Sequence, residues 1–351
     1  MAARARVPSV VILMYHSVVE DPRLTQNTIG ISQSRSDFEA HVKVIAQKFN
    51  PVTIEQVTRF AAGDCHLPAN SLAVTFDDGF LDKYQVVLPI LARHGVPATF
   101  YLMVDSVDSG IPPWYCRLNF SVRTTQRIGR ADPEYAVLCG MKLGEDRAKV
   151  LQIVVNECAR KVGKEQAEFV RRLETALDVE PLGPESRLML RCDEVRELRK
   201  LGHTIGGHTL SHPNLSHVSK EQALSEIFGY KRRLEQELGE PVAHFSYPHP
   251  ALNPQWTPCT LSITREAGFQ SAVLTTCGPV RFGDELLAMK RIYAASDLDQ
   301  CLEPAVHIPG QIGVAGQAPH DRKSGTPGVG RLRDSTFAGW LPANLRFVER
   351  F

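Results

Sequence analysis

Apolar runs recur along the chain, and amphipathic stretches separate them. The first run, VVILMYHSV at 10–18, begins with an unbroken apolar segment, which is typical of strands that a parallel sheet buries on both faces. A short strand followed by a helix is predicted within 51–63. The remaining predicted strands are LAVTF at 72–76, PATFYLMV at 97–104, HTIGGHT at 203–209, AHFSYPHP at 243–250, SAVLTTCG at 271–278 and LLAMKRIYA at 286–294.

Helical periodicity fills the intervals between these strands. The stretch 34–50 is predicted to be a helix with Ser36 as its N-cap. The stretch 219–239 is an amphipathic helix that follows Ser219 and ends at Gly239. Strands that alternate with helices at this spacing predict an α/β protein with a parallel sheet, closed into a barrel.

Two segments do not follow this alternation. Residues 105–188 contain helical stretches such as EQAEFVRRLETAL, and we interpret them as a helical insertion between barrel strands that walls one side of a site. Residues 310–351 begin with a region rich in Gly and Pro and are predicted to be a C-terminal extension. The barrel domain is therefore expected to span 1–309, with the insertion inside it.

Composition narrows the classes of partner and location. The 351 residues are 43% hydrophobic and 23% charged, with a formal net charge of +1, which gives no electrostatic reason to expect nucleic acid or an anionic membrane as the main partner. The eight cysteines include no C-x-x-C pair, so reduced thiols are expected. The apolar start is too short for a secretory signal, and no stretch is long enough to span a membrane. A cytoplasmic location is expected, with peripheral attachment to a membrane-bound assembly left open.

A pair of carboxylates marks the end of one predicted strand. Asp77 and Asp78 directly follow the strand at 72–76, and Gly79 marks the exit from it. Short acidic residues at such a place also make turns and cap helices, and for DDG alone this structural interpretation is the ordinary one. Consecutive side chains leave a strand on opposite sides, so the two carboxylates could divide the tasks of binding a metal and taking a proton from water.

A histidine-rich stretch, GHTIGGHTLSHPNLSH at 202–217, supplies the second candidate feature. His208 and His212 are spaced i, i+4, which predicts two imidazoles on one side of a helical turn, after a tight backbone turn at Gly206 and Gly207. Such a stretch alone is often only a polar surface. Two imidazoles and one carboxylate with an open fourth position, however, make a catalytic zinc-type site.

These motifs together resemble the polysaccharide deacetylase family, also described as the NodB-homology domain or carbohydrate esterase family 4. TFDDGF and HTLSH carry the resemblance, and ILMYHSV, HFSYP, EAGFQSAVLTTCG and MKRI extend it over residues 8–295, interrupted by the insertion. The resemblance implies a distorted (β/α)7 barrel. It also implies an enzyme that removes N-acetyl groups from N-acetylated carbohydrates with a divalent metal, expected to be Zn²⁺.

Carried over residue by residue, the resemblance implies a role for each motif position. Asp77 would be the general base, and Asp78, His208 and His212 would bind the metal. Tyr247, in HFSYP, matches the residue whose backbone N–H helps to stabilise the tetrahedral oxyanion.

The chain departs from the family pattern next to Tyr247. Family members usually have a glycine two positions after the motif proline, whereas Pro248 is followed here by His249 and Pro250. Many members also have an arginine in this strand that orients the catalytic aspartate. His244 is the nearest candidate by position, although a core or surface histidine is its simpler interpretation.

The general acid is the third departure, and two histidines are candidates for it. His307 lies late in the chain, in EPAVHIPG, without a convincing motif. His16, in MYHSV, is the better candidate, because the branch of the family that deacetylates exopolysaccharides of the poly-N-acetylglucosamine type begins with this Tyr-His. A hydrogen-bonded buried histidine is the structural alternative.

The expected function is de-N-acetylation of a sugar or polysaccharide, in exopolysaccharide or cell-envelope biosynthesis, with an association with an exopolysaccharide assembly system as a further expectation. Two alternatives stay open from the sequence. The His249-Pro250 departure would suit a non-catalytic carbohydrate-binding member. Trp114 and Tyr115 could instead form a stacking or lipid-facing wall for a lipid-linked sugar or a non-sugar amide, although core aromatics are the plainer interpretation.

Overall fold

The structure is a computed structural model that describes residues 8–21, 31–127, 147–294, 298 and 302. They belong to one compact unit, Met1–Ala305. The predicted extension at 310–351 and His307 lie outside the described residues.

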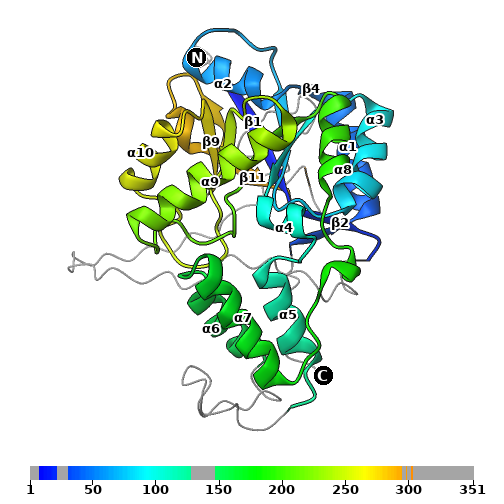
Figure 1. The fold of residues 1–351 in the computed structure, drawn as a ribbon. Coiled ribbons are helices and arrows are strands. Elements are labelled where there is room, and N and C mark those ends of the chain that lie inside the picture. The colour runs from blue at the N-terminus through cyan, green and yellow to red at the C-terminus, as the bar shows by residue number, and fades with distance from the viewer. Residues whose placement is uncertain (1–7, 22–30, 128–146, 295–297, 299–301, 303–351) are drawn as a thin grey trace, which may run out of the picture. The chain divides into compact units, whose positions relative to one another are not determined.

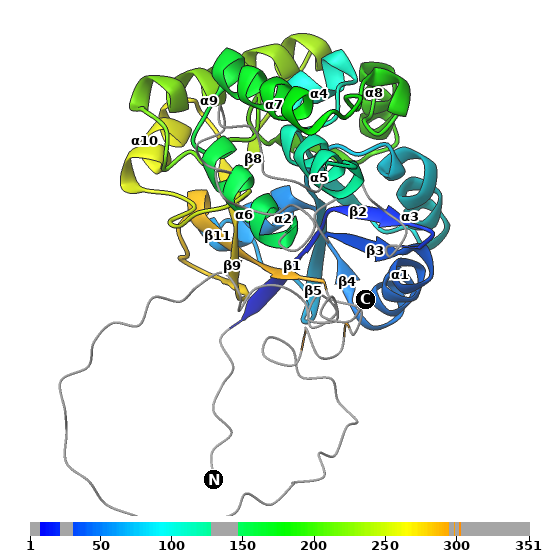
Figure 2. The same ribbon diagram turned by 90° about the horizontal axis from the view of Figure 1, so that it is seen from below.

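Seven parallel strands close into a barrel, which confirms the fold predicted from the sequence (Figure 2). Each strand pairs with the next, and β5 pairs with β1 to complete the ring. In order around the ring, the strands are β1 (Ser9–Tyr15), β11 (Met289–Tyr293), β9 (Ser271–Cys277), β8 (His244–Ser246), β7 (Thr204–Gly207), β6 (Ala98–Leu102) and β5 (Ser71–Phe76). All residues of β5, and all but the first of β1, are buried, because helices cover the outer face of the ring.

Short strands pair with members of the ring or with each other. β10 (Val280–Arg281) pairs antiparallel with β1, and β4 (Asn50–Pro51) pairs with β5. β2 (Ser17–Val19) and β3 (Ser32–Ser34) form a separate parallel pair.

Helices follow the barrel strands in the alternation that the sequence predicts (Figures 1 and 2). Ser219 caps α9 and Gly239 ends it in the left-handed region, as predicted. The predicted cap at Ser36 is wrong: Ser34 accepts a hydrogen bond from the Asp37 N–H and starts α1. The helices around the barrel are α1 (Arg35–Lys48), α2 (Ile54–Ala62), α3 (Leu88–His94), α8 (Cys192–Lys200), α9 (Lys220–Leu238) and α10 (Pro258–Glu266).

In the described part of the segment between β6 and α8, which the sequence marks as an insertion, there are four α-helices. They are α4 (Val104–Ser109), α5 (Trp114–Thr124), α6 (Arg147–Cys158) and α7 (Gly163–Leu177). α5, α6 and α7 share an apolar cluster that includes Leu118, Val154 and Leu173, and Phe80 and Met103, which follow barrel strands, belong to the same cluster. Figure 1 shows these three helices beyond the carboxyl ends of the barrel strands, which is the end where barrel enzymes place their sites. In the described part of the chain, no helix is both long enough and apolar enough to cross a membrane.

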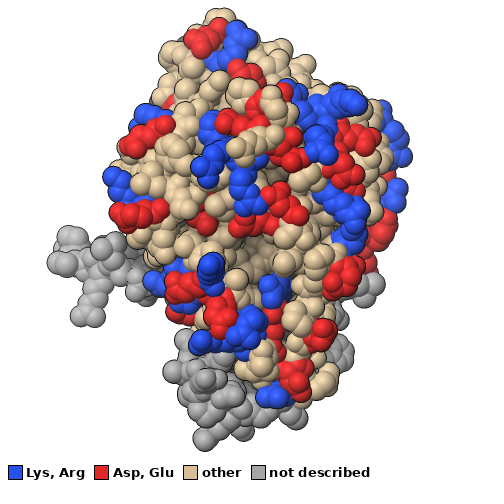
Figure 3. Space-filling view, in the orientation of Figure 1, with Lys and Arg blue, Asp and Glu red and all other residues tan. Residues whose placement is uncertain are grey.

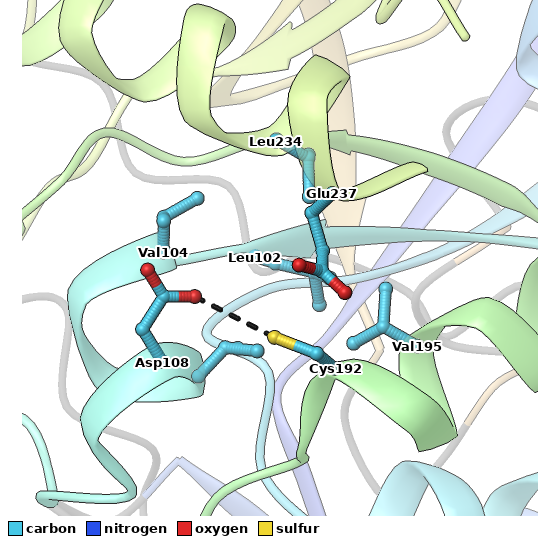
Figure 4. Close-up of a pocket in the computed structure, with 8 residues that line it drawn as sticks. Leu102, Val104, Asp108, Cys192, Val195, Leu234 and Glu237 are labelled. Atoms are coloured by element: carbon cyan, nitrogen blue, oxygen red, sulfur yellow. Dashed lines mark hydrogen bonds between the residues drawn. The ribbon is translucent and has the colours of Figure 1, made fainter. Parts of the chain in front are cut away.

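Ion pairs join the helices on the face shown in Figure 3, where basic and acidic side chains are interspersed. Arg233 of α9 pairs with Asp105 and Asp108 of α4, and Arg196 of α8 pairs with Glu237 of α9. A small pocket lies between these helices (Figure 4). It is lined by Leu102, Val104, Val107, Asp108, Cys192, Val195, Leu234 and Glu237, with the Cys192 thiol 3.5 Å from an oxygen of Asp108. Aliphatic side chains dominate this pocket, and none of the predicted site residues lines it.

Candidate metal and catalytic site

The two adjacent aspartates lie where β5 ends at the barrel rim. The Asp77 N–H donates to the Tyr15 carbonyl oxygen at 3.0 Å, which continues the pairing of β5 with β1. Asp78 then takes a left-handed backbone conformation with φ of 79°, and Gly79 follows with φ of 82°. A non-glycine residue in this region is uncommon and concentrates at functional sites. This turn fixes the direction of the Asp78 carboxylate.

Asp78, His208 and His212 form a buried cluster of potential metal ligands. Their ligand atoms all lie within 4.8 Å of one another. The Oδ1 atom of Asp78 is 3.5 Å from the Nε2 atom of each imidazole. A cation bound at about 2.0–2.2 Å from each ligand would hold such atoms roughly 3.4 Å apart in a tetrahedral arrangement. The two distances between the aspartate and the imidazoles therefore fit a divalent cation of the zinc type.

Hydrogen bonding also favours this interpretation. The Nδ1–H of His208 donates to the Ser246 carbonyl oxygen at 2.7 Å, which leaves the Nε2 lone pair directed at Asp78. Among the described residues, the buried Oδ1 of Asp78 accepts no hydrogen bond. Burial acts to raise the pKa of Asp78, but the two imidazoles outweigh it and hold that pKa well below its usual value. An ionised carboxylate and an oriented imidazole are the forms that bind a metal.

The segment that joins the two histidines is not the helical turn predicted from their spacing. Gly206 and Gly207 are the last residues of strand β7, and no turn occurs at them. They are glycines because a Cβ atom would lie 2.6 Å from the Tyr101 ring at Gly206 and 2.5 Å from the Tyr230 ring at Gly207. Beyond the strand, an irregular loop with left-handed φ of 62° at His212 brings the second imidazole back toward the first.

A buried carboxylate braces this loop. Glu226 of α9 accepts hydrogen bonds from the N–H groups of Leu210 and Ser211, both at 2.9 Å, and from the Ser211 hydroxyl at 2.7 Å. The loop therefore has fixed partners for its backbone between the two histidines.

Asp77 is held by a buried arginine from β11. Two nitrogens of the Arg291 guanidinium lie 2.7 Å from the two carboxylate oxygens of Asp77, and the Ser246 hydroxyl donates to the same carboxylate at 3.2 Å. Arg291 is fully buried. Burial alone would raise the pKa of Asp77, whereas Arg291 lowers it to about 2. Asp77 is thus ionised at neutral pH, as a general base must be.

The residue that orients Asp77 is Arg291 and not His244, the candidate suggested by position in the sequence. His244 begins β8, and its ring is hydrogen-bonded to the Ser271 hydroxyl at 2.8 Å and pairs with Glu55 at 3.2 Å. The guanidinium comes instead from the MKRI segment, at the opposite end of the sequence from Asp77. Its signal in the sequence is a charged residue within the predicted strand LLAMKRIYA, at a position that the barrel buries.

His16 follows β1 and lies on the same rim as Asp77. Tyr15 pairs in register with Phe76, so the next residue of each strand, His16 or Asp77, emerges at the same level. Burial lowers the pKa of His16, while the carboxylates of Asp78 and Asp77 act to raise it. The His16 carbonyl oxygen accepts a hydrogen bond from the buried ammonium of Lys83. His16 is therefore close enough to the aspartates for their charges to affect its pKa.

Tyr247 does not present its N–H to this site. That N–H donates to the Val273 carbonyl oxygen at 3.2 Å, within the pairing of β8 with β9. The Tyr247 hydroxyl contacts Thr264 at 3.1 Å. The amide predicted to stabilise an oxyanion is therefore already committed to the sheet. The ring of His249, two residues later, is hydrogen-bonded to the Thr275 hydroxyl and to the Leu252 carbonyl oxygen.

The insertion reaches the candidate metal ligands. The Trp114 indole N–H donates to the His212 carbonyl oxygen at 3.2 Å, and the Tyr115 ring lies 5.0 Å from the His212 ring, measured between centroids. Both aromatic residues are buried, so they do not form the exposed stacking wall considered from the sequence. They belong to the surroundings of the metal cluster.

A seven-stranded parallel barrel with this cluster, and with an arginine-held carboxylate beside it, defines a hydrolase of the carbohydrate deacetylase class. The chain belongs to the polysaccharide deacetylase family, whose sequence profile matches residues 66–272.

Solved structures show the same fold. The deacetylase PplD of Streptococcus pyogenes, in complex with acetate, aligns with a TM-score of 0.56 at 18% identity over 86% of this chain and 100% of that one. IcaB of Ammonifex degensii aligns with a TM-score of 0.53 at 19% identity over 82% of this chain and 92% of that one. YxkH of Bacillus subtilis (strain 168), whose name places it among the polysaccharide deacetylases, is 29% identical over 97 residues. The match covers 27% of this chain and 32% of YxkH, so it spans about a third of that relative.

Proposed function

We propose that this protein is a metal-dependent deacetylase that removes N-acetyl groups from an N-acetylated sugar or polysaccharide. One observation carries the proposal: the ligand atoms of Asp78, His208 and His212 converge within 4.8 Å beside a second carboxylate, Asp77, that Arg291 holds. A non-catalytic carbohydrate-binding protein would have no need for a buried, ionised base next to a metal cluster. The presence of both a potential metal cluster and a neighbouring base therefore supports an enzyme over a non-catalytic binding protein.

The chain's own residues account for the proton movements of amide hydrolysis. A divalent cation bound to Asp78, His208 and His212 would polarise the acetyl carbonyl group and lower the pKa of an attacking water. Asp77 takes the proton from this water as the water oxygen bonds to the carbonyl carbon. Arg291 keeps Asp77 ionised and fixed in direction until that transfer.

We assign proton donation to His16. When the carbon–nitrogen bond breaks, the amine of the sugar needs a proton and acetate leaves. The lowered pKa of His16 makes its protonated form a stronger acid, and the neighbouring aspartates favour that form. Because the Tyr247 N–H is engaged in the sheet, we do not assign the oxyanion role to it.

The substrate class follows from the family, and an N-acetylhexosamine polymer is the expected member. The Tyr15-His16 pair supports an exopolysaccharide, with a role in exopolysaccharide or cell-envelope biosynthesis and in association with its assembly system. Zn²⁺ as the metal and a cytoplasmic location belong to the same proposal. An acetate-release screen over chitooligosaccharides, poly-N-acetylglucosamine fragments and lipid-linked N-acetylhexosamines tests it, since release from only the last of these would favour the lipid-linked alternative.

Removal of the metal should abolish activity reversibly. Treatment with a strong chelator is expected to stop acetate release, because the bound cation is the group proposed to polarise the carbonyl, and added Zn²⁺ should restore it. Acetate release and metal content are measured on the same samples. Full activity in protein shown to be free of metal would refute the proposed mechanism.

Substitution of the candidate general acids should separate His16 from His307. His16→Gln is expected to lower kcat by about 10²–10⁴-fold, because the leaving amine loses its proton donor. His307→Gln serves as the matched variant and should retain parental kcat. The opposite pattern would assign the role to His307. The measurement is the steady-state rate of acetate release on the best substrate from the screen.

A further inference from the structure

The hydroxyl group of Tyr115 is buried in the core without a partner of its own. The side chain is 4% exposed, and among the described residues the hydroxyl has no partner at ordinary hydrogen-bond geometry. A buried hydroxyl without a partner is costly, so a phenylalanine would suit a purely structural position better. Burial raises the pKa of Tyr115, and the next strongest contribution is the charge of Asp78. The Tyr115 ring packs against His212, whose Nε2 atom is 3.5 Å from the Asp78 carboxylate, so the phenol lies in the surroundings of that carboxylate.

The ring of Tyr115 contacts a second ligand. Its centroid is 5.0 Å from that of the His212 imidazole, with an angle of 51° between the planes. The preceding residue, Trp114, donates its indole N–H to the His212 backbone at 3.2 Å. The first turn of α5 thus contacts both the backbone and the imidazole of His212. His212 has left-handed φ, and these contacts help to keep it in that conformation.

The insertion holds this first turn in a fixed place. Arg117 of α5 forms two hydrogen bonds with the buried Glu174 of α7, at 2.8 and 2.5 Å. The loop after His212 is tied to the same body, since the Asn214 N–H donates to the Ala159 carbonyl oxygen at 2.9 Å. α5 and the metal-binding loop are therefore positioned by one packed unit.

We propose that Tyr115 is a positioning residue of the metal centre, whose hydroxyl supports the Asp78 carboxylate and whose ring orients the His212 imidazole. The helical insertion would then determine metal affinity in addition to covering the site. The inference rests on the proposed metal dependence. Groups that orient metal ligands in this way typically change metal affinity by about 10–100-fold when they are removed.

The test is the affinity of the full chain for Zn²⁺ alone, measured by competition with a chromophoric chelator. Tyr115→Phe keeps the ring and removes the hydroxyl, and it is expected to weaken Zn²⁺ binding about tenfold. Tyr115→Leu also removes the ring contact with His212 and should weaken binding further. Thermal unfolding of the metal-free proteins shows whether each variant folds.

Tyr15→Phe is the matched control, because it removes another buried phenol hydroxyl, one that contacts the His41 ring at 3.1 Å. This variant should keep parental Zn²⁺ affinity. The absorption spectrum of the Co²⁺-substituted protein gives a second readout, and it should change in Tyr115→Phe but not in Tyr15→Phe.

Several outcomes would overturn the proposal. Parental Zn²⁺ affinity in Tyr115→Phe, whether kcat falls or not, would show that the hydroxyl does not act through Asp78. Equal loss of affinity in both phenylalanine variants would indicate a general effect of stability. If the parent binds no Zn²⁺, the metal centre and this role both fail. If the parent binds Zn²⁺ but releases acetate from no substrate, only the proposed function fails, and the comparison of affinities still decides the role of Tyr115.

Discussion

Asp77→Asn is expected to lower acetate release by about 10²–10⁴-fold while the protein retains its metal. Asparagine has nearly the same shape as aspartate and can still accept a hydrogen bond from Arg291, but it cannot take a proton from water. The three candidate metal ligands are unchanged, so metal content should stay at the parental level. The measurements are kcat for acetate release and metal content after dialysis.

Asp78→Asn is the neighbouring control with the opposite expectation. It removes the only anionic ligand of the cluster, so metal binding should be lost together with activity. The pair separates the two tasks that the adjacent carboxylates are proposed to divide. If Asp77→Asn retained full activity, Asp77 would not be the base.

Arg291→Met is expected to destabilise the metal-free protein by about 3–5 kcal/mol near neutral pH, because it leaves the buried charge of Asp77 without a partner. Methionine fills much of the same volume, so the loss reports mainly on charge. Urea unfolding of the parent and the variant measures the difference in free energy of unfolding. Arg291→Lys keeps a charge without the bidentate contact, and its free energy of unfolding should lie between those of the parent and Arg291→Met.

The destabilisation by Arg291→Met should depend on pH in a defined direction. In the parent, the folded-state pKa of Asp77, about 2, is below its usual value of 3.8. The stabilisation that this carboxylate contributes is therefore present above pH of about 4 and is lost as the pH falls toward 2. Without Arg291, burial acts to raise the pKa of Asp77, so the variant is destabilised at every pH at which this carboxylate is ionised in the unfolded chain. The difference between the two proteins should shrink as the pH falls to about 3.

A double variant, Asp77→Asn with Arg291→Met, provides the control for this second prediction. Removal of both charges should restore part of the lost stability, because neither charge is left buried and unpaired. A difference in free energy of unfolding that stays constant with pH, or a double variant no more stable than Arg291→Met, would contradict the assigned role of this ion pair.

The barrel could be predicted because its signals are local. Continuous apolar runs such as the one at 10–18, alternating with capped helices such as α9, specify parallel strands covered by helices. Asp77 follows a predicted strand and His208 lies near the end of another, and parallel strands bring their carboxyl ends to one rim. These residues could therefore be grouped before the structure was known.

Other features depend on long-range contacts and could not be predicted. The spacing of His208 and His212 suggested a helical turn. The segment between them is instead a loop, and Glu226 of α9 holds its backbone. Gly206 suggested a turn, but a glycine is required there because the Tyr101 ring leaves no space for a side chain. The free N–H expected at Tyr247 is engaged because β9 pairs beside it.

The sequence by itself determined the alternation of strands and helices, the family, and the residue types gathered at one end of the barrel, since periodicity and short motifs record local preferences. Only the tertiary structure decided which groups face one another. Closure of the ring places Arg291 of β11 against Asp77 at the end of β5, and the packing of α5 places Tyr115 against His212. The physical reason is that partners more than 200 residues apart, or carried by an insertion, are selected by burial and charge in the folded state, and no local pattern records that selection.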